Sequence, residues 1–145
     1  MRRQVVIFTF GVLALSVLVA GGCGKDSSPT TPTPTPTVSF AQQIQTEILN
    51  PACIACHTDQ GRTPAGGLVL LSGQSRGNLV GVASTGKTGA TRVIAGNASG
   101  SYLIQKLEGA SDIVGLRMPR NGPPFLTDAQ VALIRQWINN GAPAN

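Results

Sequence analysis

Aromatic and charged side chains are both scarce in this sequence of 145 residues. It contains four Phe, one Tyr and one Trp, and only 12% of its residues are charged. Two of the phenylalanines, Phe8 and Phe10, lie in an apolar stretch near the N-terminus. The length excludes a multidomain enzyme, and the composition excludes a collagen-like repeat and a multi-pass membrane protein. A domain with so little aromatic mass needs something else to fill its centre.

Basic residues outnumber acidic ones but are scattered along the chain. The formal net charge is +5, and Arg2 and Arg3 contribute part of it at the extreme N-terminus. No run of basic residues interleaved with aromatic residues is present to follow a phosphate backbone. We therefore expect no nucleic-acid partner.

The N-terminus has the order of an export signal. Two arginines precede a mostly apolar stretch over residues 5–20, and small residues then lead to Cys23. This order is typical of a signal peptide and predicts that residues 1–22 are removed. The stretch is shorter than the roughly 20 residues that cross a bilayer as a helix. Because two glycines extend it, an uncleaved anchor helix is the alternative.

The end of this stretch, Ala-Gly-Gly-Cys at 20–23, resembles the cleavage box of bacterial lipoproteins. The resemblance implies that Cys23 is lipidated and anchors an exported protein to a membrane, facing the periplasm or the cell surface. Lipidation also accounts for an odd cysteine, for which coincidence is the alternative. Since Gly24 carries no acidic retention signal, the resemblance implies the outer membrane in a cell that has two.

Residues 23–37 are predicted to be a tether. After a short polar stretch, Pro and Thr alternate over residues 29–37. Because proline fixes φ and has no N–H to donate, this segment should be extended and unpacked. We expect a spacer that holds one folded domain, residues 38–145, away from the lipid surface.

The first helix of that domain is predicted over residues 40–49. Ser39 and Gln42 have the spacing of a capping box, and apolar residues then recur at every fourth position. Asn50 and Pro51 are predicted to end the helix.

Two further helices are predicted near the C-terminus. Apolar residues share one face over residues 101–108, where Gly109 can adopt the left-handed cap. Thr127 and Gln130 form a second capping box before a broad apolar face over residues 128–140.

The region between the first and second helices is rich in glycine and is predicted to be mostly loop. Only residues 68–71 and 92–94 have the composition of short strands. Phe40 and Trp137, one in each of the outer helices, are interpreted as helix-packing residues.

The sequence Cys-Ile-Ala-Cys-His at 53–57 follows the first predicted helix directly. The pattern C-x-x-C-H is typical of c-type haem attachment. Cys53 and Cys56 are spaced to reach the two vinyl groups of one porphyrin, and His57 is placed to give an imidazole nitrogen to its iron. A covalently bound haem would supply the missing centre of the domain.

From residue 39 to residue 142 the sequence resembles the class I mono-haem cytochromes c. The resemblance rests on C-x-x-C-H after an N-terminal helix, a methionine in a later loop and a closing C-terminal helix. It implies a mainly α fold of about three short helices and glycine-rich loops wrapped around one covalently bound haem c. It also implies one-electron transfer to redox partner proteins, which makes the protein an electron carrier and not an enzyme.

Met118 is the candidate for the second axial position of the iron. The chain has one histidine, and the other methionine is lost with the signal peptide. Pro119 favours an extended backbone at Met118, which places the thioether on a strap. A methionine that fills a gap in the core, Lys87 or Lys106 as ligand, and an open iron site are the alternatives.

The surroundings of the iron site are predicted less directly. His57 should donate its second ring N–H to a carbonyl, and the resemblance points to a proline carbonyl, for which Pro64 is the nearest candidate. Arg62, Arg117 and Arg120 are candidates for pairing with the haem propionates or for a docking rim; the alternative is that they are solvated surface residues.

Three other site types are weighed against haem. Residues 81–88 match the phosphate-binding loop G-x-x-x-x-G-K-T, but no strand, helix or acidic residue is placed to complete it, so we expect no nucleotide. Cys53 and Cys56 lack the βαβ context of a thioredoxin-like disulfide. Zinc would need a fourth ligand that the sequence does not place nearby.

The prediction is therefore a membrane-tethered c-type cytochrome with a haem iron ligated by His57 and Met118. The alternative is a haem enzyme or gas sensor in which the sixth iron position is open or Met118 is displaceable. A third possibility is a lipoprotein without haem whose two motif cysteines are structural.

Overall fold

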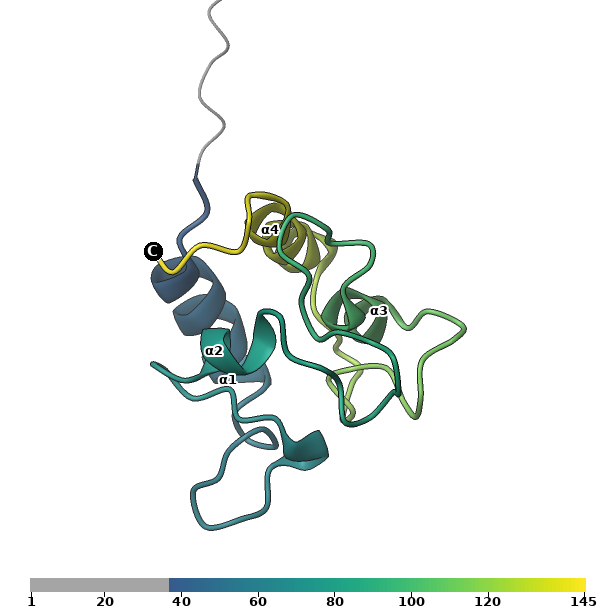
Figure 1. The fold of residues 1–145 in the computed structure, drawn as a ribbon. Coiled ribbons are helices and arrows are strands. Elements are labelled where there is room, and N and C mark those ends of the chain that lie inside the picture. The colour runs from purple at the N-terminus through teal and green to yellow at the C-terminus, as the bar shows by residue number, and fades with distance from the viewer. Residues whose placement is uncertain (1–36) are drawn as a thin grey trace, which may run out of the picture. The chain divides into compact units, whose positions relative to one another are not determined.

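The computed structural model describes residues 37–145, shown as the coloured ribbon in Figure 1. The predicted signal peptide, Cys23 and nearly all of the predicted tether lie outside the described residues. Within residues 37–145 the chain is helical and forms no sheet, which confirms the mainly α prediction. Its elements are η1 (Phe40–Leu49), α1 (Asn50–Ala52), η2 (Ala65–Gly67), α2 (Ser75–Leu79), α3 (Tyr102–Glu108) and α4 (Asp128–Asn139).

The first helix, η1, has the predicted bounds but is wound as a π-helix. The Ser39 hydroxyl accepts a hydrogen bond from the backbone N–H of Gln42 at 3.3 Å. The reciprocal bond differs from the predicted capping box, because Ser39 N donates to the side chain of Gln43 at 3.0 Å and not to that of Gln42. The wider π turn accounts for this shift by one residue.

The prediction that Asn50 and Pro51 end the helix is wrong. Helix α1 continues from η1 without a break, and Cys53 N donates to Leu49 O at 2.9 Å. Pro51 is tolerated because it lies in the first turn of α1, where the bonding pattern changes from π to α. The helix therefore leads directly into the cysteine motif.

The two C-terminal helices are confirmed. Helix α3 ends at Gly109, which has φ 73° as predicted for a left-handed cap. Helix α4 begins with the predicted capping box: Thr127 Oγ1 accepts from Gln130 N at 3.2 Å, and Thr127 N donates to Gln130 Oε1 at 2.9 Å.

The glycine-rich middle contains two short helices, η2 and α2, that the sequence did not predict. Helix α2 begins at Ser75, which is fully buried and donates its hydroxyl to the side-chain carbonyl of Gln45 in η1. Because this contact joins residues that are distant in the sequence, no local pattern predicts it. The loop over residues 81–88 has only isolated bridges beside it and is a glycine loop, as predicted.

The two predicted strands are wrong. Residues 68–71 form no bridge, and residues 92–94 contribute only isolated bridges, one of them between Val93 and Val80. The apolar residues of both segments are packed as loop because the many left-handed glycines around them interrupt any extended pairing.

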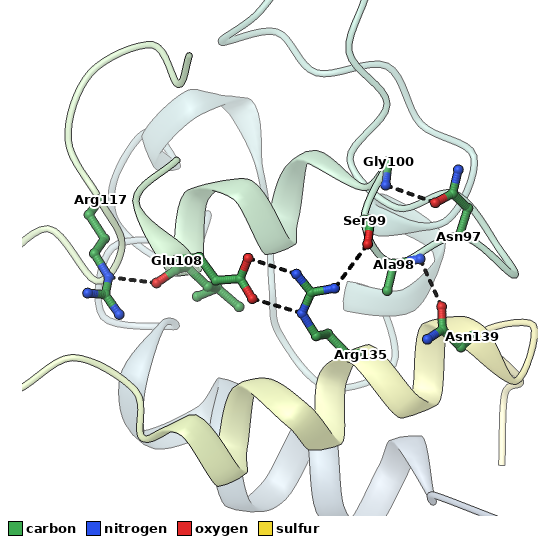
Figure 2. Close-up of polar contacts among 9 residues, drawn as sticks. Asn97, Ala98, Ser99, Gly100, Glu108, Arg117, Arg135 and Asn139 are labelled. Carbon is green, nitrogen blue, oxygen red and sulfur yellow. Dashed lines mark hydrogen bonds and ion pairs between the residues drawn. The ribbon is translucent and has the colours of Figure 1, made fainter. Parts of the chain in front are cut away.

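Part of the core lies between η1 and α4, which confirms the packing role of Phe40 and Trp137. Their ring centroids are 4.8 Å apart, and the indole N–H of Trp137 donates to Pro143 O at 2.9 Å. Helix α3 is joined to α4 by Glu108, whose two carboxylate oxygens each lie 2.8 Å from a guanidinium nitrogen of Arg135 (Figure 2). The largest fully buried side chains are Trp137, Ile44, Leu49, Leu79, Ile104, Ile134, Ile138 and Val93.

Candidate functional site

The cysteine motif forms one hydrogen-bonded turn at the end of α1. Cys56 N and His57 N both donate to Cys53 O, at 3.1 and 3.0 Å. Both cysteines are free thiols; that of Cys53 is half-buried and that of Cys56 is exposed. The two thiols and the imidazole thus lie on one tight turn that follows α1 directly.

His57 is held by backbone groups of the following loop. Its Nδ1 lies 3.2 Å from Leu68 O, and its own carbonyl accepts from Leu70 N at 2.8 Å. Since a carbonyl only accepts, Nδ1 carries the proton in the neutral ring, and Nε2 keeps the lone pair that can bind a metal. The prediction of a carbonyl partner is confirmed, but the choice of Pro64 is wrong.

The reason for the change of partner lies in η2. The carbonyl of Pro64 is taken up by Gly67 N at 3.0 Å in that short helix. The loop then passes the ring of His57, and the carbonyl of Leu68 lies within hydrogen-bond distance of Nδ1. Because this partner is a main-chain carbonyl, the type of residue at position 68 could not have predicted it.

Burial sets the protonation of the motif. Desolvation lowers the pKa of His57, the nearby charge of Arg92 lowers it further, and the backbone carbonyls of Leu68 and Ala65 oppose both. The neutral imidazole, which is the form that binds metals, is thereby favoured near pH 7. Burial also raises the pKa of the Cys53 thiol to about 11, with Cys56 as the smaller cause, so this sulfur is held as a thiol.

Met118 is half-buried and packs against the same apolar cluster as Cys53. Its backbone N–H donates to Lys106 O in α3 at 2.8 Å. The interpretation of Met118 as part of a strap is supported by its position between a loop and a run of prolines outside any helix. Partial packing against the core is also what the gap-filling alternative requires.

The segments next to the motif and next to Met118 line one pocket of about 320 Å³. Pro51 and Ala52 come from the helix that precedes Cys53. Pro119 and Phe125 come from the segment that follows Met118. None of Cys53, Cys56, His57 and Met118 lines this pocket itself, so the structure brings together segments that neighbour these residues and not the four residues of the predicted iron site.

The two lysines considered as iron ligands are engaged elsewhere. Lys87 Nζ lies 2.6 Å from the carboxylate of Asp112 and 5.4 Å from the ring centre of Tyr102. Lys106 Nζ donates to Val114 O at 2.9 Å and also to Leu116 O. The structure thus places neither amine as a free ligand.

Two of the candidate arginines bind loop carbonyls. Arg62 Nη1 donates to Ala55 O at 2.6 Å, within the motif itself. Arg117 Nε donates to Leu107 O at 2.7 Å (Figure 2), and its guanidinium lies over the ring of Phe125 at 4.2 Å. Arg120 is exposed. Within the described residues, Arg62 and Arg117 share no hydrogen-bond partner.

Arg92 is a buried cation that the sequence did not single out. It is 9% exposed, and its guanidinium donates to Asn78 O at 2.9 Å and to Gly67 O at 3.2 Å. In the part of the chain that the structure describes, its hydrogen-bond partners are carbonyls and not carboxylates. It ties α2 to η2 and so supports the loop that carries Leu68. Nothing in its sequence neighbours distinguishes it from a surface arginine.

The zinc, disulfide and phosphate-loop alternatives can each be compared with the positions of their residues. Within residues 37–145 no three His, Cys, Asp or Glu side chains are grouped to hold a metal ion, so Cys53, Cys56 and His57 do not form a zinc-type cluster. Cys53 and Cys56 are not joined by a disulfide. The lysine of the phosphate-loop pattern, Lys87, is paired with Asp112.

Comparisons of the chain with protein-family models, with curated proteins and with solved structures found no match. Of the helices in residues 37–145, none has the length and apolar character needed to cross a bilayer. The site is therefore interpreted from its own residues.

Proposed function

We propose that this protein is a one-electron carrier: an exported c-type cytochrome whose haem is bound to Cys53 and Cys56 and whose iron is ligated by His57 and Met118. The observation that carries the proposal is the arrangement of His57. Its Nδ1 is bound to Leu68 O and its neutral form is favoured, so its Nε2 is prepared for a metal, directly beside two free thiols.

The donor set fits this cofactor and fits zinc poorly. Two thiols without a disulfide, one imidazole with a fixed tautomer and one thioether are the groups that haem c needs. Attachment requires no oxidant, because each S–H adds across a vinyl group, with the sulfur on one carbon and the hydrogen on the other.

When bound, the haem iron supplies a reversible one-electron couple. The residues of this chain determine how that couple is used. His57, oriented by Leu68 O, would give the iron an imidazole nitrogen, and Met118 would give it a neutral sulfur, which favours ferrous iron and raises the potential. With both ligands supplied by the protein, no iron position would be left for a substrate.

Little rearrangement is expected between the two oxidation states. Cys53 and Met118 pack against one cluster of buried apolar residues. A rigid shell of this kind keeps both axial ligands in place when the charge of the site changes. The proposal therefore favours a carrier over an enzyme.

The N-terminal segment completes the proposal. Lipidation at Cys23 would hold the domain at a membrane facing the periplasm or the cell surface, and residues 23–37 would give it reach toward redox partner proteins. The support for this part is the sequence order alone, from a positive end through an apolar stretch to Ala-Gly-Gly-Cys.

The test is a comparison of wild type with Met118→Ala, both made in a host that attaches haem. Ferric wild type should be low-spin with the weak near-red charge-transfer band of a thioether ligand, and Met118→Ala should lack that band and have a lower potential. High-spin wild type that binds carbon monoxide at once would favour the haem enzyme or gas sensor instead. A denatured protein with no covalent pigment would favour the lipoprotein without haem.

A further inference from the structure

The middle of the strap that carries Met118, residues 113–118, is not held by packing. Val114 and Leu116 are 57% and 60% exposed, whereas Ile113 and Met118 at the two ends are half-buried. Gly115 between the two exposed residues has φ 74°, a conformation that favours glycine. Something other than burial must fix the middle of the strap.

Hydrogen bonds to α3 do so. Val114 N donates to the hydroxyl of Tyr102 at 3.0 Å, and Met118 N donates to Lys106 O at 2.8 Å. Between these two bonds, the ammonium of Lys106 donates to the carbonyls of Val114, at 2.9 Å, and of Leu116. The strap is therefore bonded to α3 at both ends and in the middle.

A neighbouring bond uses the free end of the same helix. The last carbonyls of a helix lack partners within it, and in α3 two of them are taken by the strap: that of Lys106 by Met118 N and that of Leu107 by Arg117 Nε, at 2.7 Å. Figure 2 shows Arg117 reaching this end of α3.

Lys106 is the residue on which most of these bonds depend. Its main chain binds Met118 directly, and its side chain binds the carbonyls on either side of Gly115. Bonds from an ammonium are stronger than bonds between neutral groups, because the donor carries a full charge. Lys87, the other lysine near this surface, binds Asp112 and no strap carbonyl.

We infer that Lys106 is a positioning residue for Met118: by holding residues 114 and 116 against α3, it keeps the thioether at the iron. The inference rests on the proposed function, in which Met118 is an axial ligand. Loss of the ammonium leaves two carbonyls without their charged donor and frees the strap at its turn, so the thioether should leave the iron more often.

The experiment uses the full chain with haem attached and compares Lys106→Leu with the matched control Lys87→Leu. Each variant loses one ammonium and gains an apolar side chain that cannot ligate iron. In Lys106→Leu we expect carbon monoxide to bind the ferrous protein about tenfold faster, with a weaker thioether band in the ferric protein. In Lys87→Leu both readouts should equal those of wild type, and Lys106→Arg should recover most of the band.

Failure of the inference and failure of the proposed function are distinguishable. If wild type itself lacks the thioether band, the proposed function fails. If wild type has the band and Lys106→Leu matches it in band and in carbon monoxide rate, or if Lys87→Leu is impaired equally, the inference is overturned. Thermal unfolding of both variants separates loss of the fold from loss of the ligand, and Lys106→Gln takes the place of Lys106→Leu if the latter does not fold.

Discussion

Replacement of Trp137 by alanine should be the most damaging single change in the described domain. The indole has 0% exposure, stacks on Phe40 at 4.8 Å and donates to Pro143 O at 2.9 Å. Trp137→Ala removes the ring pair, the hydrogen bond and the largest fully buried side chain together. We expect the free energy of unfolding to fall by about 4 kcal/mol, which lowers the melting temperature by roughly 20 °C.

A graded series of variants separates these contributions. Trp137→Phe keeps a ring against Phe40 but leaves Pro143 O without its donor, so it should cost about 1.5 kcal/mol. Ala132→Ser, on the exposed side of α4, should stay within about 0.5 kcal/mol of wild type. Urea unfolding followed by circular dichroism measures all three. A loss below about 1 kcal/mol for Trp137→Ala would refute the placement of the core between η1 and α4.

Three further outcomes are expected. Arg135 holds the pKa of Glu108 below its usual value, chiefly by a hydrogen bond, so the pair stabilises the fold above the unfolded pKa of Glu108 and is lost as pH falls through the folded one. Because the pair is partly exposed, the free energy of unfolding of Glu108→Gln in urea should lie at most about 0.5 kcal/mol below that of wild type near neutral pH. The two values should converge in acid, and a difference that stays constant with pH would contradict this. Gly109→Ala should lower the free energy of unfolding by about 1.5 kcal/mol, since φ is 73° and the added carbon would meet Arg117 Cδ at 3.0 Å. A melting temperature equal to that of wild type would contradict this expectation. Cys23→Ser should release intact domain from the membrane fraction, whereas retention there would indicate an uncleaved helix.

The parts of the fold that local chemistry determines were predictable. The capping residues Thr127 and Gln130 and the left-handed Gly109 mark their helix ends whatever surrounds them. The spacing of residues 53–57 predicts a haem-attachment site in the same local way, and this site stays a prediction. These features need no knowledge of the tertiary fold.

The remainder depends on contacts between distant segments. Helix α2 forms where Ser75 meets Gln45, thirty positions earlier. The partner of His57 is a main-chain carbonyl, and its identity follows from the course of the loop and not from the type of residue at 68. The bonds of Lys106 to residues 114 and 116 likewise exist only once the strap has folded back onto α3. No local pattern contains this information.

The central claim, a haem joined to Cys53 and Cys56, is tested most directly by the intact mass of the fully denatured chain. The protein should be made in a host that attaches haem and measured beside a Cys53→Ala, Cys56→Ala double variant. Wild type is expected to carry the mass of one haem through denaturation, and the double variant is expected to lack it. A wild-type chain of unmodified mass within residues 37–145 would contradict it.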